Sequence, residues 1–304
     1  MSFVMAKIET AQFYLDQCIK AGKDQNTKKD KRLLKQRHIS AIDRMTQKAK
    51  SLLGNIIKNF PSIDNLNEFY QELIRSTVDY DLLKKSLASL NWAAKKEESF
   101  AKDYKRKVLR CTEEKEAYAL RREHLGRFAS VFKQIKKHLV YLERVRYVMQ
   151  DYPTIKEGLF TIAIAGFPNA GKSTLLKKLT GANVEIAAYA FTTKRLNIGY
   201  FTAHHLKIQC IDTPGTLNRP EKMNKVEMQA HLAMKYVAEL IVLVMDCTDD
   251  AEKNTALLHA LEKFDKPILI YQSKTDIAEP LPILGSFHDE QAVKQAIIAH
   301  IRIV

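Results

Sequence analysis

Apolar side chains recur every three or four residues through the first half of the chain. One such run comprises Ile42, Met45, Ala49, Leu52 and Ile56. A longer run with the same spacing extends from Leu125 to Met149. This period places the apolar side chains on one face of an α-helix, and only one proline and three glycines interrupt residues 1 to 150. We therefore predict five helices, near residues 4–21, 29–59, 64–77, 80–111 and 113–150, which pack as an antiparallel bundle.

After Pro153 the pattern changes to short β-rich runs that alternate with helical segments. The predicted strands cover residues 160–165, 196–202, 206–211, 240–246, 267–272 and 281–286. The predicted helices cover residues 172–180, 221–237, 251–264 and 288–302. Such alternation is typical of a mostly parallel sheet wrapped by helices. Only three residues join the second and third strands, too few for a crossover, so we predict that this pair is antiparallel. The chain is thus divided into a helical domain of residues 1–158 and an α/β domain of residues 159–304.

Composition and charge indicate the class of protein and the cellular compartment to expect. The 304 residues carry a net charge of +14, and 46% of them are hydrophobic. No uncharged apolar stretch reaches the roughly 18 residues that a membrane span needs, and the N-terminus lacks the layout of a signal peptide. The four cysteines stand far apart without a C-x-x-C pair, which argues against a zinc site or a disulfide framework. We expect a cytoplasmic protein.

The positive charge is concentrated in the helical half. Residues 1–160 contain 33 basic and 20 acidic side chains, whereas residues 161–304 contain 16 and 15. This asymmetry favours a polyanionic partner, with RNA ahead of a membrane. The candidate RNA contacts are Lys28, Lys29, Lys31, Arg32, Lys35 and Arg37 in one cluster, and Lys102, Lys105, Arg106, Lys107 and Arg110 in a second. A third cluster contains Lys133, Lys136 and Lys137. For any single cluster, a solvated helix face is the alternative.

The motif GFPNAGKST follows the first predicted strand and fits the G-x-x-x-x-G-K-[ST] phosphate-binding loop. Its residues are Gly166, Phe167, Pro168, Asn169, Ala170, Gly171, Lys172, Ser173 and Thr174. The glycines let backbone N–H groups face phosphate oxygens, Lys172 can reach the β and γ phosphates, and Ser173 can ligate Mg²⁺. A chance match in a glycine turn is the alternative, which the rest of the chain has to decide.

Three further motifs follow in the order that a guanine-nucleotide site requires. Asp212, Thr213, Pro214 and Gly215 come directly after a predicted strand, where Asp212 can hold the Mg²⁺ shell and the Gly215 N–H can contact a γ phosphate. Thr193 lies between this motif and the phosphate loop, and its hydroxyl can complete the Mg²⁺ shell. Ser273, Lys274 and Asp276 follow the apolar strand from Pro267 to Tyr271, at the carboxyl edge of the sheet. There Asp276 can accept hydrogen bonds from guanine N1–H and its 2-amino group. Together the motifs predict a GTP or GDP site.

These motifs resemble the Obg-like branch of translation-factor-type GTPases, and most closely the nucleolar GTP-binding protein family in a compact archaeal-like form. The resemblance rests on GFPNAGKST, YAFTTK at 189–194, DTPG at 212–215 with Arg219 and Pro220, VEMQA at 226–230 and MD at 245–246. YLERVR at 141–146 and PTI at 153–155 extend it toward the N-terminus. It implies a helical bundle followed by a Ras-like P-loop GTPase domain with one antiparallel strand in a mostly parallel sheet. The chain ends at Val304 without the long extension of the eukaryotic members.

The sequence departs from the family pattern on the base side. Ser273 stands where an asparagine is usual and can make fewer hydrogen bonds, so we expect weaker affinity with guanine selectivity retained. The loop that faces guanine O6 aligns best with residues 284–286, which makes Gly285 and Ser286 candidate contacts. The helix after Asp276 is expected to shrink to a few residues.

The expected activity is slow, Mg²⁺-dependent hydrolysis of GTP to GDP and phosphate. Lys172, Thr193, Gly215 and Asn169 are the candidate catalytic residues. Thr216 occupies the place of the glutamine that orients water in Ras-type proteins and is too short for that task. In related GTPases an asparagine at the place of Asn169 helps to hold a monovalent cation, which makes K⁺ a candidate cofactor; a plain turn residue is the alternative.

The family resemblance implies a switch in assembly of the large ribosomal subunit, with rRNA and ribosomal proteins of the precursor as partners and a monomer away from the ribosome. Residues 185–194 and 213–225 would then fold around the γ phosphate. An RNA-binding assembly scaffold with negligible turnover is the competing hypothesis. A membrane-bound GTPase ranks last, because neither a lipidation signal nor an apolar anchor is visible.

Overall fold

The computed structural model describes residues 3–23, 34–181, 196–203, 205–214, 224–283 and 285–301. The chain divides into two compact units. One contains Ser2–Leu66 and Ile74–Tyr152, and the other contains Asn67–Leu73 and Pro153–Val304. The assignment of residues 1–158 and 159–304 as separate folding domains stays a prediction.

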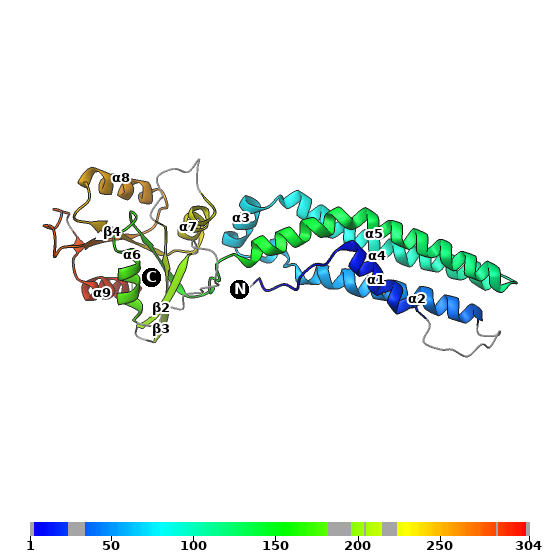
Figure 1. The fold of residues 1–304 in the computed structure, drawn as a ribbon. Helices are drawn as coiled ribbons and strands as arrows, with labels where there is room; N and C mark the ends of the chain where they lie inside the picture. The colour runs from blue at the N-terminus through cyan, green and yellow to red at the C-terminus, as the bar shows by residue number, and fades with distance from the viewer. Residues whose placement is uncertain are drawn as a thin grey trace. The chain divides into compact units, whose positions relative to one another are not determined.

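In the first unit, four helices lie alongside one another in Figure 1: α1 Ala11–Gly22, α2 Leu34–Asn59, α4 Tyr80–Arg110 and α5 Glu114–Gln150. A further helix, α3 Glu68–Thr77, is divided between the two units, because residues 68–73 belong to the second. A short 3₁₀ turn, η2, covers Ile63–Asn65. Asp79 caps α4 by accepting a hydrogen bond from Leu82 N at 2.9 Å. The α2, α4 and α5 stripes bury residues such as Ile42, Leu90 and Phe128 completely, which confirms the predicted bundle.

The first helix begins later than predicted. We expected a helix from residue 4, but α1 starts at Ala11 because Thr10 caps it, accepting from Phe13 N at 3.2 Å. Residues before the cap instead bury Phe3, Met5 and Ile8. Glu143 accepts a hydrogen bond from Ile8 N at 2.8 Å, which ties this segment to α5.

Two ionisable side chains lie fully buried inside the bundle. Both carboxyl oxygens of Glu97 on α4 have no hydrogen-bond partner among the described residues, and burial raises the pKa of Glu97 to about 9. His124 on α5 packs against the rings of Tyr104 and Phe128, and burial lowers its pKa to about 4. Both groups are therefore neutral near pH 7, as their apolar surroundings require.

The second unit contains a six-stranded sheet in the order β2-β3-β1-β4-β5-β6. The strands are β1 Phe160–Ala165, β2 Asn197–Ala203, β3 Leu206–Asp212, β4 Leu240–Asp246, β5 Ile268–Ser273 and β6 Ser286–Phe287. Only β2 and β3 pair in antiparallel fashion, and the other neighbours are parallel. The helices are α6 Lys172–Thr180, α7 Lys225–Tyr236, α8 Ala251–Glu262 and α9 Glu290–Ile301. This confirms the predicted fold class.

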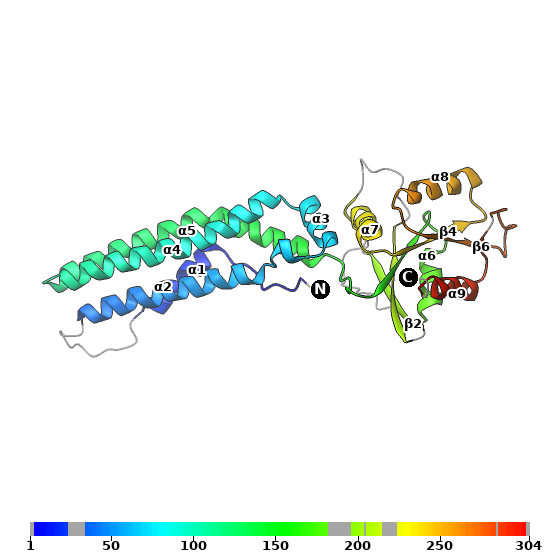
Figure 2. The same ribbon diagram turned by 180° about the vertical axis from the view of Figure 1, so that it is seen from behind.

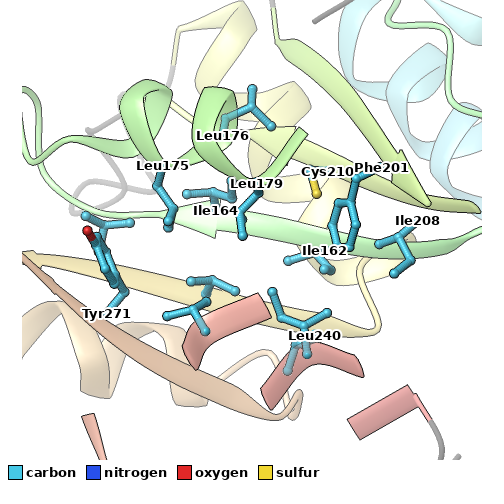
Figure 3. Packing of buried hydrophobic residues seen from close by; sticks show 14 of the residues in the cluster. Ile162, Ile164, Leu175, Leu176, Leu179, Phe201, Ile208, Cys210, Leu240 and Tyr271 are labelled. Carbon is cyan, nitrogen blue, oxygen red and sulfur yellow. The ribbon is translucent and has the colours of Figure 1, made fainter. Parts of the chain in front are cut away.

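The sheet has an apolar core on each face, as its continuous apolar strands require. On one face, Ile162 and Ile164 of β1 meet Leu175, Leu176 and Leu179 of α6, as Figure 3 shows, and α9 adds Val293 and Ile297. On the other face, Ala163 and Ala165 pack with residues of α7 and α8 such as Met234 and Leu257. Figure 2 shows α6 with α9 and, across the sheet, α7 with α8.

The last strand is shorter than predicted. We expected a strand at 281–286, but only Ser286 and Phe287 pair with β5. Pro280 and Pro282 flank Leu281 and have no N–H to donate to a strand ladder. The polypeptide before β6 is therefore held by side chains rather than by strand pairing.

Replacing Glu97 by glutamine is expected to flatten the pH dependence of stability. The raised pKa of Glu97 means that the folded state binds the proton more tightly than the unfolded state. Stability is therefore lost as pH rises from about 4.5 through about 9. Glutamine cannot ionise, so the Glu97→Gln protein should melt higher than the parent at pH 9, by about 2–4 °C for each kcal/mol recovered, with the gap closing toward pH 5.

Thermal melts between pH 5 and 9 measure this gap. Glu98→Gln is the matched control, because Glu98 is the next residue on α4 but pairs with Lys50 at 2.5 Å in a half-exposed position. Parallel curves for the parent and the Glu97→Gln protein would contradict the prediction.

Candidate nucleotide-binding site

The candidate phosphate loop connects β1 to α6, and its backbone requires special residues at three positions. Gly166 has φ 152°, and a Cβ there would lie 2.5 Å from the carbonyl oxygen of Val244 on β4. Gly171 has φ 94°, although a Cβ would meet nothing closer than Ser273 Cβ at 3.5 Å. Asn169 has φ 64°, a left-handed conformation that asparagine tolerates better than most residues. The backbone conformation of the loop thus explains why the motif has glycine or asparagine at these three positions.

Lys172 is the first residue of α6 and lies almost completely buried. Its ammonium donates to the carbonyl oxygen of Phe167 at 2.6 Å, across the loop. Burial lowers the pKa of Lys172, and the charge of Asp212 opposes that shift. A cation inside the turn at a helix N-terminus is the arrangement that suits phosphate oxygens.

Asp212 ends β3 beside the phosphate loop, because β3 and β1 are parallel neighbours with Asp212 opposite Ile164. Its Oδ2 accepts from Ser173 Oγ at 2.6 Å and from Asn197 Nδ2 at 3.2 Å. Its Oδ1 is buried and has no partner among the described residues. Thr213 then ties the strand end to β1, through Oγ1 at 2.8 Å from Ile164 O.

A magnesium ion fits this donor set. Mg²⁺ prefers oxygen ligands and is usually held by one or two side chains together with phosphates and water. The hydroxyl of Ser173 and the unpaired Oδ1 of Asp212 meet that description. In the described part of the chain, no cluster of three or more His, Cys, Asp or Glu side chains offers an all-protein cage.

The candidate base side begins where β5 ends. Ser273 Oγ lies 2.6 Å from Ala170 O of the phosphate loop and 3.2 Å from Met245 O. The serine hydroxyl therefore reaches the phosphate loop despite being shorter than the usual asparagine. Lys274 has φ 59°, and its ammonium pairs with the carboxylate of Asp246 at the end of β4.

Asp246 anchors that lysine from a nearly buried position. Its Oδ1 accepts from Thr248 N at 2.9 Å and from Thr248 Oγ1 at 2.6 Å. Burial by itself would raise the pKa of Asp246, but the hydrogen bonds from Lys274 and Thr248 outweigh it, and the net pKa is lowered. A charged carboxylate thus holds the Lys274 side chain at the base side.

The remaining base-side residues lie in the loops after β5. Asp276 is exposed, in a single helical turn in which Ile277 N donates to Lys274 O at 3.0 Å. The short turn agrees with the expected loss of a helix here. Gly285 has φ 76°, and Ser286 Oγ donates to Ile283 O at 2.8 Å.

The structure brings most of the predicted site residues to one edge of the sheet. These residues lie at the carboxyl ends of parallel strands or in the loops that follow those ends. They are residues 166–174, Asp212, Ser273, Lys274, Asp276 and the 285–286 loop. Thr193 and Gly215 lie outside the described residues, as does Thr216. Sequence reasoning missed Asn197 as a partner of Asp212 and Asp246 as the anchor of Lys274. The signal for Asp246 was present, since it is a carboxylate at the end of an apolar strand.

The described residues of the basic clusters lie on helices of the first unit. Lys102, Arg106 and Arg110 are exposed at spacings of four residues on α4, so they share one face. Lys107 is exposed and lies over the Tyr104 ring. Lys105 instead pairs with Asp43 at 2.6 Å, and Lys35 donates to Leu109 O at 3.5 Å. Lys28, Lys29, Lys31 and Arg32 lie outside the described residues, and Arg37 has interactions within the fold.

The fold and the site define a P-loop GTPase domain preceded by a helical domain. Residues 161–274 match the family model of the 50S ribosome-binding GTPase, and residues 1–156 match the NOG1 N-terminal helical domain. Since the second model covers more than half of the chain, the chain belongs to the NOG1 family of nucleolar GTP-binding proteins.

Three comparisons with known proteins describe what the chain is similar to. An uncharacterised protein of Methanocaldococcus jannaschii, MJ1408, is 39% identical over 75% of this chain and 65% of its own length. Nucleolar GTP-binding protein 1 of Saccharomyces cerevisiae is 34% identical over 74% of this chain and 36% of its own length. A solved structure of a nucleolar GTP-binding protein 1 from Plasmodium falciparum shares 28% identity over 49% of this chain and 74% of that chain, with a TM-score of 0.37. The match thus spans about a third of the length of the yeast relative.

Among the described helices, none is long and apolar enough to cross a membrane.

The glycines of the phosphate loop should differ in their tolerance of alanine. Gly166→Ala should lower GDP affinity at least tenfold and cost about 1–3 kcal/mol of stability, because both the conformation and the Val244 carbonyl oppose a Cβ. Gly171→Ala should cost less, since only its conformation is strained. Gly54→Ala in α2, where a Cβ meets nothing within 4 Å, is the control and should leave GDP affinity unchanged. Fluorescence titration with labelled GDP and thermal melts measure these effects, and equal losses at Gly166 and Gly54 would contradict the assignment.

Proposed function

We propose that this protein is a GTP-hydrolysing switch that acts in assembly of the large ribosomal subunit. The observation that carries the proposal is the convergence of the glycine loop, Asp212 and the Ser273 to Asp276 turn at one edge of the sheet. Family membership supports both guanine nucleotide binding and a ribosomal setting. Names of the relatives refer to the nucleolus, and in a cell without one we place the protein in the cytoplasm.

The phosphate side would bind GTP with the residues that the site provides. Lys172 and the N–H groups of residues 166–173 would hold the β and γ phosphates. Ser173 and Asp212 would hold Mg²⁺ together with the hydroxyl of Thr193, and the bound ion would neutralise charge that develops on the phosphates. Gly215 would contact the γ phosphate. On the base side, Asp276 would select guanine through N1–H and the 2-amino group.

Hydrolysis would be slow, because Thr216 cannot orient water as a glutamine does. Positioning and the electrostatics of Lys172, Mg²⁺ and backbone N–H groups would supply most of the rate. Asn169 would add a K⁺ ion that stabilises transition-state charge. The left-handed φ of Asn169 supports the alternative equally well, since a turn alone explains an asparagine there.

The two roles of Asn169 make different predictions for one substitution. Glycine accepts the φ of 64° without strain, so Asn169→Gly removes the side chain while preserving the turn. If the side chain holds K⁺, the parent should hydrolyse GTP at least tenfold faster in K⁺ than in Na⁺, and the Asn169→Gly protein should lose that difference. Single-turnover hydrolysis in each salt measures it. Equal parental rates in K⁺ and Na⁺ would leave Asn169 as a turn residue.

The helical unit would contact rRNA of the precursor, with ribosomal proteins nearby. The exposed stripe of Lys102, Arg106 and Arg110 on α4 and the exposed Lys133, Lys136 and Lys137 on α5 support this role. Lys105 contributes less, because Asp43 already pairs with it. An RNA-binding scaffold with negligible turnover is the second candidate, and the same basic surface favours it.

A binding experiment distinguishes a switch from a scaffold. We expect the protein loaded with a non-hydrolysable GTP analogue to bind purified large-subunit precursors about tenfold more tightly than the GDP form, a coupling of about 1.4 kcal/mol. Lys172→Ala should remove this nucleotide dependence, because it removes the phosphate-binding cation. Sedimentation of the protein with the particles measures the affinity. Equal binding of both nucleotide forms would overturn the switch and favour the scaffold.

Charge variants provide the control for the same assay. Alanine at Lys102, Arg106 and Arg110 should weaken both nucleotide forms alike and reduce the salt dependence of binding, because fewer counterions are released from RNA. Alanine at three exposed lysines of the other unit, Lys235, Lys253 and Lys263, matches the loss of charge. If the two triple variants had equal effects, the α4 stripe would be a solvated helix face and not an RNA contact.

A further inference from the structure

We propose that Gln272 is the positioning residue that sets base selectivity, by holding the loop that contains Leu281 and Ser286 beside the proposed guanine site. The proposal rests on the proposed guanine-nucleotide function and names a determinant within it. Gln272 lies one residue before the Ser273 to Asp276 turn and is completely buried. Gln272 is not itself one of the residues of the guanine-nucleotide motifs.

The amide of Gln272 uses its whole hydrogen-bonding capacity. Its Nε2 donates to Leu281 O at 2.9 Å and to Ser286 Oγ at 2.8 Å. Its Oε1 accepts from Leu281 N at 2.6 Å and from Cys247 Sγ at 3.3 Å. Two donors and two acceptor sites are thus all occupied, which fixes the orientation of the amide.

The pairing with Leu281 replaces a strand ladder. The side-chain amide bonds both the N–H and the carbonyl of Leu281, as a backbone peptide of a neighbouring strand would. Prolines on both sides of Leu281 prevent regular pairing there, and β6 contributes only Ser286 and Phe287. Ser286 Oγ then donates to Ile283 O at 2.8 Å, which closes the loop. Before β6 begins, the Gln272 side chain therefore supplies the hydrogen bonds from β5 to Leu281, and the short pairing of Ser286 and Phe287 with β5 supplies the rest.

Ser273 and Gln272 divide two tasks at the end of β5. Successive side chains of a strand point to opposite faces. Ser273 accordingly reaches Ala170 in the phosphate loop, while Gln272 reaches the 281–286 loop. The strand end thereby ties the two loops, which contact different parts of a nucleotide, to one rigid element.

The consequence for selectivity concerns atom 6 of the purine ring. Guanine has a carbonyl oxygen there, which accepts hydrogen bonds, whereas adenine has an amino group, which donates them. Held in place, the loop would present backbone N–H groups that stabilise the oxygen and reject the amino group, although the N–H of Ser286 itself donates to Ile283 O at 3.4 Å. Loss of the Gln272 amide would leave the Leu281 N–H without its partner and weaken the attachment of the loop to β5, although Ile283 N would still donate to Leu281 O at 2.7 Å.

The test measures discrimination at single atoms of the base. GDP and 6-thio-GDP differ only in oxygen or sulfur at position 6, and GDP and IDP differ only in the 2-amino group. We expect Gln272→Leu, which preserves volume, to weaken GDP about tenfold and to bring the GDP to 6-thio-GDP affinity ratio close to one. The GDP to IDP ratio should stay unchanged in that variant, because Asp276 reads the 2-amino group.

Gln209→Leu is the matched control. Gln209 is also completely buried, on β3, but its amide bonds Lys156 N at 3.0 Å and Thr161 Oγ1 at 3.1 Å, away from β5 and β6. It should lose stability while keeping the 6-position ratio, and Asp276→Ala should change the 2-position ratio instead. Titrations that monitor intrinsic fluorescence give the affinities, and thermal melts confirm that each variant is folded.

The outcomes separate this proposal from the proposed function. If the parent protein binds none of the diphosphates, the guanine-nucleotide function fails. If the parent prefers GDP and Gln272→Leu keeps the parental 6-position ratio, the positioning role of Gln272 is overturned while the function stands. A loss of the ratio in Gln209→Leu as large as in Gln272→Leu would also overturn it, because general destabilisation would then explain both.

Discussion

The phosphate loop lies against the sheet edge because Gly166 has no side chain. The loop passes so close to β4 that any Cβ would meet the Val244 carbonyl oxygen at 2.5 Å. This close approach lets Ala170 reach Ser273 Oγ on β5 and lets Ser173 reach Asp212 on β3. Three strand ends thereby meet one loop. The rest of the site depends on this packing, because the other predicted nucleotide-binding residues can reach a bound nucleotide only if the loop lies close to the strand ends that carry them.

Charge is distributed across the site in a way that suits a polyphosphate with a divalent cation. Lys172 is buried inside the loop and Asp212 has one unpaired oxygen, so a cation and an anionic acceptor lie beside each other without neutralising each other by direct contact. At the base side, Asp246 and Lys274 do pair directly. The first arrangement leaves groups available for phosphate and Mg²⁺, whereas the second fixes a side chain in place.

The helical unit differs from the nucleotide site in how its charged groups are distributed. Its core buries Glu97 and His124 in neutral form, while basic side chains occupy the surface of α4 and α5. The bundle is therefore apolar inside, with ionisable exceptions that cost stability, and strongly positive outside. An exterior of that kind is the basis of the proposed contact with rRNA.

The sequence alone determined the helical period of the bundle, the alternation of strands and helices, and the residues of the phosphate loop. These features are local, because spacing and glycine positions encode them directly. The start of α1 depends on the Thr10 cap, and the shortening of β6 depends on two prolines. Both signals are present in the sequence, but the prediction followed the apolar pattern instead. Only the tertiary structure revealed the contacts of Asn197 with Asp212, Asp246 with Lys274 and Gln272 with Leu281. Each joins residues from different elements of the fold, and the parallel sheet alone decides which strand ends become neighbours.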